Sequence, residues 1–300
     1  MRVIEQAEMA RFTSFRAGGT ARRLVTAENT EELKNVLDEL ARKGEPHVFL
    51  GNGTNTIFAD GCYEGTVVTL GEAFGEIEVT EAPEGQAAGE AGACGTVRAG
   101  AAALLSRVAR AAAAKGLGGF EFAAGIPGSI GGAVFMNAGA YGGEISRVAE
   151  SARILFGDRI EEVPAEKLRF GYRYSALQEN GGIVLSVIFS LVPGKKEESF
   201  RLIRDLDARR REKQPLDRGS AGSFFKRPKD GFAGALIEQA GLKGVSVGGA
   251  QVSPKHAGFI VNNGNATCED VLKLKDLVIR AVREKSGVEL ETEVRLAGDM

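Results

Sequence analysis

Apolar side chains over the first seventy residues alternate between helical and strand-like spacing. Leucines and valines at three- and four-residue intervals over residues 33–40 predict an amphipathic helix that opens at Thr30 and ends at Gly44. The short apolar runs 47–50 and 66–70 are typical of buried strands. Together these signals predict a first unit of the βαβ type.

The following stretch, up to about residue 200, consists mostly of short apolar runs separated by turn residues. An alanine-rich segment, 103–119, has helix-forming composition and a stop signal at Gly116. Three later runs are expected as strands, at residues 151–157, 159–164 and 181–194. We therefore predict a second unit that is mainly β-sheet.

The last third of the chain returns to mixed helix and strand signals. A charged helix over 197–215, ended by Pro215, is expected to connect the second unit to a third one. Thr267 and Asp270 have the spacing of a capping box at the start of a later helix. The other elements expected here are helices at 232–244 and 267–287 and strands at 257–264 and 288–298.

Two glycine-rich stretches interrupt these patterns. Residues 125–143 hold seven of the 41 glycines, together with apolar anchors such as Ile130 and Phe135 that a disordered linker would lack. Residues 51–55 follow directly on a predicted strand, where phosphate-binding loops commonly lie. Because glycine lets main-chain N–H groups approach an anion closely, a phosphate cradle is one interpretation. Tight turns inside an α/β core are the other, and these residues alone leave both open.

Composition narrows the classes of function. The formal net charge is −2 and no basic stripe carries interleaved aromatic residues, so a nucleic-acid partner is not expected. The chain places neither a GxSxG elbow nor a GxGxxG turn between a predicted strand and a helix, since its one GxSxG string, residues 244–248, follows a predicted helix. This disfavours a serine hydrolase and a nicotinamide-binding Rossmann domain. With no long apolar run and no apolar signal-peptide core, we expect a cytoplasmic protein without membrane insertion.

Cysteine and histidine usage argues against metal chemistry. The three cysteines, Cys62, Cys94 and Cys268, are widely separated and are expected to be reduced. His47 and His256 lie far apart in the sequence and have no HExxH or CxxC partner. No bound metal is therefore expected.

Seven motifs then follow one another in an order seen in one enzyme family. They are TSFRAGGTA (13–21), FLGNGTNTIFADG (49–61), the glycine-rich run 116–145, FGYRYS (170–175), GSFFKRP (222–228), KHAGFIVN (255–262) and LETEVR (290–295). In this order they resemble the UDP-N-acetylenolpyruvoylglucosamine reductase (MurB) family, flavoenzymes of peptidoglycan precursor synthesis, over essentially the whole chain. An ordered set of this kind is far more specific than one glycine-rich loop.

The resemblance implies an α+β protein with an FAD-binding fold of the vanillyl-alcohol-oxidase (PCMH) type. Two FAD-binding subdomains, 1–70 and 71–200, are then followed by an α/β substrate-binding domain at 201–288. In members of this kind the last strand returns to the second subdomain, so we expect residues 289–300 there. The 49 residues between Arg173 and Ser223 leave no room for the inserted tyrosine loop of the longer class, so the chain resembles the shorter class.

The resemblance also implies that the two glycine-rich loops hold the pyrophosphate of a non-covalently bound FAD. No histidine lies within either loop to attach the flavin. Asn137 is expected at a cofactor edge, although a side-chain cap on a buried turn would equally explain it. The cofactor-binding residues predicted in this way are Gly51, Asn52, Gly53, Thr54, Asn55, Gly125, Ile126, Pro127, Gly128, Ser129, Gly131, Gly132, Ala133, Asn137 and Gly139.

The implied reaction transfers a hydride from NADPH through FAD to the enolpyruvyl ether of UDP-N-acetylglucosamine, giving UDP-N-acetylmuramate. By the family's pattern, Arg173 holds the substrate carboxylate as negative charge develops. Ser223 donates a proton to C2, and Glu293 assists by orienting Arg173 or in its protonated form. A surface ion pair for Arg173 and a turn or cap for Ser223 are the structural alternatives.

Substrate contacts are implied for Lys213, Lys226, Arg227 and His256. Arg227 stands where many relatives have an asparagine, which favours a diphosphate contact over a uridine contact. A purely structural role for His256 remains open. Small molecules are the only partners expected, and we expect a monomer. The rival functions are an oxygen-dependent flavin oxidase of the same fold and a non-catalytic FAD-binding protein. The joint presence of Arg173, Ser223 and Glu293 disfavours the non-catalytic protein.

Overall fold

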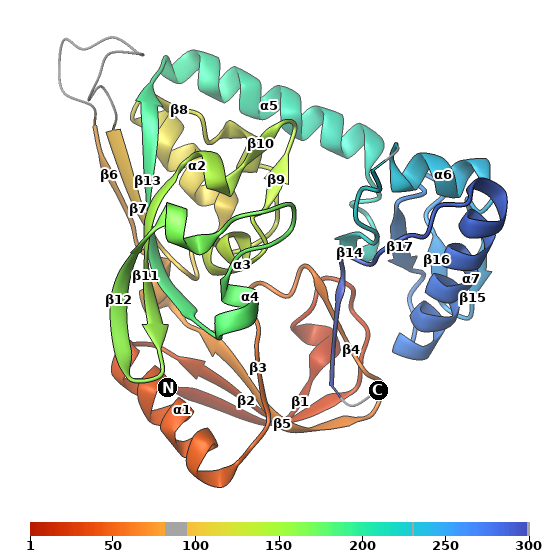
Figure 1. Ribbon diagram of the computed structural model, residues 1–300, viewed down its shortest axis with the longest axis horizontal. Coiled ribbons are helices and arrows are strands. Elements are labelled where there is room, and N and C mark those ends of the chain that lie inside the picture. Colours follow the sequence, from red (N-terminus) through yellow and green to blue (C-terminus); the bar gives the residue numbers. More distant parts are fainter. Residues whose placement is uncertain (82–94, 230, 299–300) are drawn as a thin grey trace.

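The structure, a computed structural model, describes residues 1–81, 95–229 and 231–298. Three units surround a central cleft: in Figure 1 the first lies at the bottom, the second at the upper left and the third at the right. Helix α5 (Lys196–Lys213) runs across the top from the second unit to the third. Cys94, expected to be a reduced cysteine, lies outside the described residues.

The first unit is a sheet in the order β1-β2-β5-β3, covered by helix α1 (Thr30–Lys43). Strands β2 and β3 both run parallel to β5, which confirms the βαβ pattern. The helix begins at Thr30, as expected, with the side chain of Asn29 as its N-cap, and it ends at the left-handed Gly44. The strands of this unit are β1 (Arg2–Glu8), β2 (Thr20–Ala27), β3 (His47–Phe49), β4 (Thr56–Phe58) and β5 (Cys62–Leu70).

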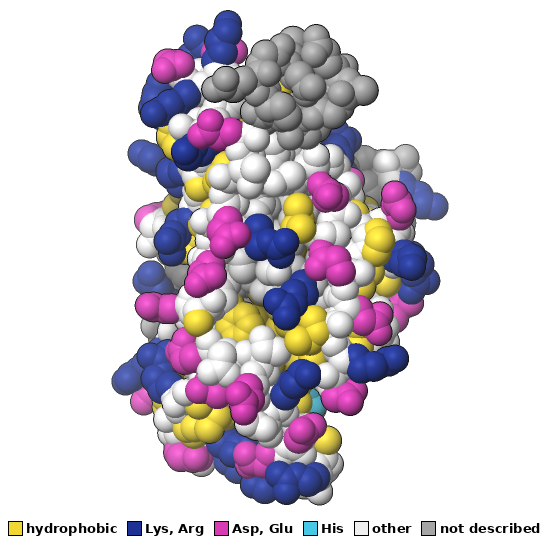
Figure 2. All heavy atoms as spheres, turned by 90° about the vertical axis from the view of Figure 1, so that its left-hand side faces the viewer, with side chains coloured by type: hydrophobic (Ala, Val, Ile, Leu, Met, Phe, Trp, Pro, Cys, Tyr) yellow, Lys and Arg dark blue, Asp and Glu magenta, His cyan; other side chains and the backbone are white. Residues whose placement is uncertain are grey.

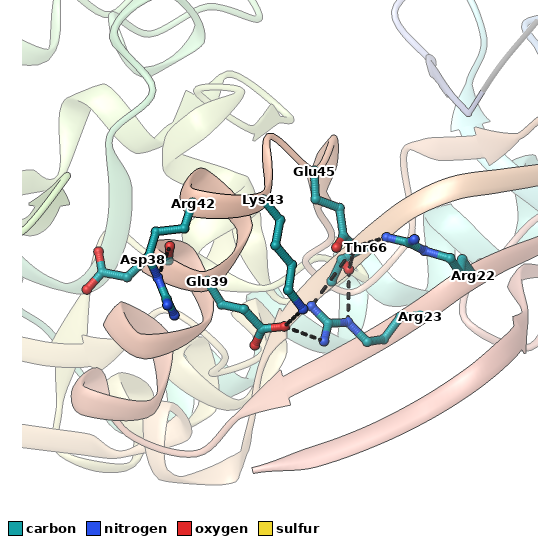
Figure 3. A network of polar contacts seen from close by, with 8 residues as sticks. All are labelled: Arg22, Arg23, Asp38, Glu39, Arg42, Lys43, Glu45 and Thr66. Atoms are coloured by element: carbon teal, nitrogen blue, oxygen red, sulfur yellow. Dashed lines mark hydrogen bonds and ion pairs between the residues drawn. The ribbon is translucent and has the colours of Figure 1, made fainter.

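A polar network fixes α1 on this sheet (Figure 3). Arg23 on β2 donates from Nε to Thr66 on β5 (3.1 Å) and from Nη1 to Glu39 on α1 (3.0 Å). Glu45 accepts from Thr66 and pairs with Arg22. The helix is therefore held by bonds to partly buried side chains as well as by its apolar face.

The second unit is an antiparallel sheet in the order β12-β11-β13-β7-β6, with β8 paired to β13. Helices α2, α3 and α5 contribute apolar side chains to the core that this sheet forms. The strands expected at 151–157, 159–164 and 181–194 are confirmed as β11, β12 and β13. The bounds are β6 (Ile77–Thr80), β7 (Gly95–Gly100), α2 (Leu105–Ala114), β8 (Leu117–Gly118), α3 (Ile130–Phe135), β9 (Gly139–Ala140), β10 (Gly143–Glu144), β11 (Ala149–Phe156), β12 (Arg159–Pro164), α4 (Leu177–Asn180) and β13 (Ile183–Pro193).

Helix α5 belongs in part to this second unit. Its Ile203 lies in the second unit's core, and its Ser199 donates to Glu121. The boundary predicted at residue 200 therefore falls inside a helix that packs against the unit before it.

The third unit is an antiparallel sheet in the order β14-β17-β16-β15, packed against α7. The side chains of Thr267 and Asp270 form the predicted capping box at the start of α7. Its elements are β14 (Gly219–Ser223), α6 (Ala233–Gln239), β15 (Ser246–Val247), β16 (Ala250–Val252), β17 (Phe259–Asn262) and α7 (Cys268–Ser286).

The third unit is docked on the first by hydrogen bonds and a shared core. The carboxylate of Asp60 accepts from the amides of Cys268 (2.6 Å) and Glu269 (2.9 Å) at the start of α7. Asn262 donates to the carbonyl oxygen of Phe15, whose ring is fully buried in the third unit's core. These contacts fix the side of the cleft that the third unit forms.

The expectation that the last strand returns to the second unit is wrong. Of the described residues 289–298, only Arg295–Ala297 forms a strand, β18, and it pairs in parallel with β4 of the first unit. The pairing is continued by a bond from the Ala59 amide to the Ala297 oxygen (2.8 Å). Ala297 also packs in the first unit's core, so long-range packing places this strand on the first unit.

Candidate active site

A cleft of about 1930 Å³ lies between the three units. The two glycine-rich loops line it, and so do Arg173, Ser223 and Glu293. The arginine and the glutamate are 120 positions apart in the sequence. The fold therefore brings the three predicted catalytic side chains into one space with both loops.

The loop 51–55 lines this cleft and has main-chain donors without protein partners. Within the described part of the chain, none of its five amides donates a hydrogen bond to a protein group. Its carbonyls are used instead: Gly53 accepts from Ser14 (2.9 Å) and Asn55 accepts from Arg295 (2.9 Å). A loop with open donors and paired acceptors offers the positive electrostatics that a phosphate group requires.

The second loop is fixed against the first and against the second unit. The side chain of Asn52 donates from Nδ2 to the carbonyl oxygen of Pro127 (2.5 Å). Gly128 accepts from the Leu105 amide at the start of α2 (3.1 Å), and Gly131 donates to the Ala101 oxygen (2.8 Å). The two loops therefore form one preorganised surface across the first and second units.

Gly53 and Gly128, one from each loop, differ in whether the protein itself leaves room for a side chain. A Cβ on Gly53 would lie 2.0 Å from the carbonyl oxygen of Phe12, and its φ of +62° is left-handed, so the chain itself requires this glycine. A Cβ on Gly128 would have no described atom closer than 3.6 Å. Since Gly128 lines the cleft, a ligand there would supply the reason for its missing side chain. Open amides and this vacant space fit the pyrophosphate of FAD.

Arg173 and Glu293 form an ion pair in the cleft. The Nε atom of Arg173 donates to Oε1 of Glu293 (2.6 Å), and its Nη2 atom donates to the oxygen of Gly139 (3.3 Å). The guanidinium lies 4.9 Å from the ring centroid of Tyr172. Only 20% of the arginine side chain and 15% of the glutamate side chain are exposed. The pair is therefore held mostly away from water, where its charges act strongly.

Burial raises the pKa of the Glu293 carboxyl, although the nearby charges of Arg173 and Lys226 lower it. Desolvation is the larger of these effects, as expected for a carboxyl that is mostly buried. The site can therefore hold a proton on Glu293 more readily than an exposed glutamate would.

Ser223 ends strand β14 at a break in the pairing with β17. The register shifts between Ser220 and Ser223, and Gly222 has a φ of +83°. Such a bulge turns the following side chain out of the regular alternation. Ser223 is exposed, and within the described residues its hydroxyl makes one long hydrogen bond, to the carbonyl oxygen of Phe225 at 3.4 Å. Ser223 is therefore free to donate to a ligand in the cleft.

The cleft carries a strong excess of positive charge. Nine lysine and arginine residues line it, against the four acidic residues Glu144, Asp207, Glu238 and Glu293. The whole chain has a net charge of −2, and Figure 2 shows acidic and basic side chains intermixed on an outer face. A cleft of this kind favours ligands that carry several negative charges.

Comparisons with known proteins agree with this geometry. Residues 21–158 match the model of an FAD binding domain, and residues 214–297 match the C-terminal domain of UDP-N-acetylenolpyruvoylglucosamine reductase. The reductase of Clostridioides difficile (strain 630) is 43% identical over 97% of this chain and 92% of its own length. That of Agathobacter rectalis is 45% identical over 99% and 94%. The crystal structure of MurB from Thermus caldophilus superposes with a TM-score of 0.79 at 35% identity and covers 98% of each chain.

The chain belongs to the UDP-N-acetylenolpyruvoylglucosamine reductase (MurB) family. It is an FAD-containing oxidoreductase, and the predicted FAD-binding fold is confirmed. Over the residues that the structure describes, no helix is long and apolar enough to cross a membrane. Histidine, cysteine and acidic side chains nowhere gather there in a group of three that could hold a metal ion.

One predicted cofactor residue of this MurB-family chain lies elsewhere. Asn137 is 2% exposed and is absent from the cleft lining. Its Nδ2 donates to the oxygen of Gly171 (2.9 Å) and its Oδ1 accepts from the amide of Ser146 (2.9 Å). Both ends of the amide are used within the protein, so Asn137 acts as the structural cap that was its alternative interpretation.

Of the four residues predicted to contact the substrate, two line the cleft and two do not. Arg227 and His256 line the cleft, whereas Lys213 and Lys226 do not. Lys213 is exposed at the end of α5, and Lys226 pairs with Glu291. Arg227 stacks on the ring of Phe232 at 4.0 Å. The prediction for both lysines relied on motif position, which does not determine the direction of a side chain.

His256 has features of both a structural residue and a substrate-contacting residue. Its Nδ1 accepts from the amide of Gly258 (3.1 Å), which is a structural role. Its ring also lines the cleft, and burial lowers its pKa below the ordinary histidine value. A neutral imidazole with Nδ1 already occupied has Nε2 left for a ligand.

Sequence reasoning missed a polar face of α5. Asp207, Arg210, Arg211 and Gln214 all line the cleft, at the spacing of one helical face, while Lys213 lies off this face. Arg210 is largely buried, and its Nη1 has no hydrogen-bond partner among the described residues. Burial lowers the pKa of this guanidinium. The three- and four-residue spacing of these polar side chains was the signal that could have revealed the face.

Proposed function

We propose that this protein reduces the enolpyruvyl ether of UDP-N-acetylglucosamine to UDP-N-acetylmuramate, with NADPH as reductant and a non-covalently bound FAD. The observation that supports this most is the meeting of Arg173, Ser223 and Glu293 in one cleft with two loops suited to a pyrophosphate. The names of the relatives support the same reaction.

The loops 51–55 and 125–132 would hold FAD, and the bound flavin would supply a hydride to the terminal carbon of the enolpyruvyl group. Hydride addition to an alkene leaves negative charge on the adjacent carbon and its carboxylate. Arg173 is preorganised to hold that carboxylate, because its guanidinium is anchored by Glu293 and Gly139. The cation would thus stabilise charge where it develops.

Ser223 would then deliver a proton to C2 of the resulting enediolate. Its hydroxyl faces the cleft with a long intramolecular contact of 3.4 Å, so little has to be broken before it donates. Glu293 would keep Arg173 in position, and its raised pKa would allow it to carry a proton beside a carboxylate substrate. The positive cleft would favour the diphosphate of the nucleotide sugar.

Stopped-flow absorbance of the flavin tests the proposal by separating the two half-reactions. Wild-type flavin should bleach with NADPH under anaerobic conditions and recover on addition of the enolpyruvyl nucleotide. Ser223→Ala should leave bleaching nearly intact and slow recovery by at least about 10²–10⁴-fold, the usual contribution of a general acid. Fast reoxidation by oxygen with no response to the nucleotide would instead identify an oxidase.

The same preparation tests the mode of flavin attachment. His47 lines the cleft near the loop, but its ring packs edge-on against Phe49 at 5.7 Å. Denaturation followed by filtration should therefore release the flavin into the filtrate. Flavin that stays with the polypeptide would contradict non-covalent binding.

A further inference from the structure

The last residue of the cofactor loop, Asn55, binds the segment that carries Glu293. Its side-chain Nδ2 donates to the main-chain oxygen of Glu293 (3.1 Å), and its own carbonyl oxygen accepts from the amide of Arg295 (2.9 Å). Two bonds from one residue therefore hold the main chain on both sides of Val294, directly after the glutamate. The side chain of Asn55, predicted from sequence to bind the cofactor, is used within the protein.

Glu293 is thereby held from three directions. Its carboxylate accepts from Arg173, its amide donates to the oxygen of Phe224 (2.9 Å), and its carbonyl accepts from Asn55. The Phe224 bond links it to the strand end that carries Ser223, and the Asn55 bond links it to the loop 51–55. Glu293 is thus the point at which the proposed proton donor, the proposed carboxylate-binding arginine and the cofactor loop are connected.

The segment around Glu293 depends on such isolated contacts. It lies outside the regular strands, since β18 begins only at Arg295. A bridge between Phe225 and Thr292 and a bond from Lys226 to the Glu291 oxygen (2.8 Å) tie it to the third unit. On the side of the first unit, the side chain of Asn55 holds the segment just before β18 by its hydrogen bond to the Glu293 oxygen. Loss of the Asn55 side chain would leave a part-buried carbonyl without its donor, which favours a shift of the segment.

We propose that Asn55 is a positioning residue, through which the cofactor loop sets the place of Glu293 and, with it, of Arg173. None of the loop's five amides has a protein partner in the described part of the chain, whereas the side chain of Asn55 donates to the C-terminal segment. Ordering of the loop by a bound pyrophosphate would therefore order Glu293 as well. The effect on catalysis rests on the proposed function, but the linkage between loop and segment does not.

Hydrogen exchange tests the linkage without any turnover. In the wild-type protein, addition of FAD should slow amide exchange both in residues 51–55 and in residues 290–295, by about tenfold or more. In Asn55→Leu, which keeps the size but removes the donor, the slowing should persist in the loop and be lost in the segment. Asn55→Ala gives a second variant of different volume. Unchanged slowing of the segment in both variants would overturn the proposal.

Asn52 provides the matched comparison. It is an asparagine of the same loop, and its Nδ2 also donates to a main-chain oxygen, but that oxygen belongs to Pro127. Asn52→Leu should weaken FAD binding, measured by quenching of flavin fluorescence, and should leave the FAD-induced slowing in residues 290–295 intact once FAD is saturating. Loss of that slowing in Asn52→Leu as well would show a general effect of the loop and reject a specific role for Asn55.

A double-mutant cycle tests the catalytic consequence with FAD-saturated protein. Asn55→Leu should slow flavin reoxidation by the enolpyruvyl nucleotide about 10–100-fold, the effect expected from a misplaced group, with NADPH bleaching little changed. In a Glu293→Gln background the same substitution should add less than about threefold, because both changes act through one residue. Additive effects would overturn the proposal. A wild-type flavin that the nucleotide does not reoxidise would reject the proposed function instead, while the exchange experiment would still decide the role of Asn55.

Discussion

Glu293 shows how two opposing effects act on one residue. Arg173 at 2.6 Å favours the carboxylate, while burial favours the protonated acid, and burial is the larger effect on the pKa. The sequence motif identified both residues but could not show that they contact each other. Their separation in the chain is bridged only by the fold, so the pair could not have been derived from local pattern.

The raised pKa of Glu293 gives a prediction for stability against pH. The folded protein binds more protons than the unfolded chain between the ordinary glutamate pKa, about 4.3, and the higher folded value. The contribution of Glu293 to the free energy of unfolding is therefore fully present below that pH window and is lost as the pH rises through it. We expect the Tm of the wild type, relative to Glu293→Gln, to fall as the pH rises from the ordinary glutamate pKa through the raised pKa of the folded protein. Calorimetry of the flavin-free protein measures this; a relative Tm that rises would mean that the ion pair outweighs burial.

Gly53 and Gly128 should respond differently to the same substitution. Gly53→Ala places a Cβ against the oxygen of Phe12 at a left-handed φ, so the flavin-free protein should lose about 1–3 kcal/mol of stability. Gly128→Val should leave that stability within about 1 kcal/mol and greatly reduce FAD binding, because its side chain enters open cleft. Urea unfolding and flavin titration measure the two effects. Full flavin occupancy in Gly128→Val would show that no ligand uses this space.

At the scale of elements, periodicity and capping predicted most of what was observed. Helix α1, helix α7 with its capping box, and the strands β11 to β13 lie where local pattern placed them. The return of β18 to β4 was mispredicted because three residues carry no periodicity of their own, and their partner is chosen by long-range packing. The cleft-facing side of α5 was missed because its charged composition resembled a solvated surface.

Replacing Arg210, on the cleft-facing side of α5, tests whether this side of the helix contributes to FAD binding. Its buried Nη1 lacks a partner, and a Cβ on Gly125 of the cofactor loop would lie 2.9 Å from it. Arg210→Met should therefore weaken FAD binding about 10–100-fold, the worth of a charged hydrogen bond, without lowering the Tm of the flavin-free protein. Arg209→Met is the control, since Arg209 is exposed and does not line the cleft. A lower Tm with unchanged FAD affinity would assign Arg210 a structural role.

At the scale of the whole molecule, charge is separated between the cleft and the rest of the surface. Nine basic residues against four acidic ones line the cleft of a chain whose net charge is −2. Anionic ligands should be drawn in by this field, so association rates should depend on salt. We expect the rate constant for NADPH association to fall several-fold between about 0.05 M and about 0.5 M salt, while dissociation changes less. Stopped-flow measurement at several salt concentrations checks this, and a rate without salt dependence would exclude steering.

The pairing of β18 with β4 has a consequence for how the protein is made. A ribosome adds residues in order, so β4 leaves the exit tunnel long before its partner, and the first unit waits with that strand edge unpaired. Glu293 and the oxygen that Asn55 grips are also among the last groups to appear. A chain interrupted anywhere in the third unit thus has both glycine loops and no carboxylate beside Arg173. Under the proposed function, the loops that would bind the flavin are complete early, whereas reduction of the nucleotide sugar requires Glu293 and has to await synthesis of the C-terminal segment.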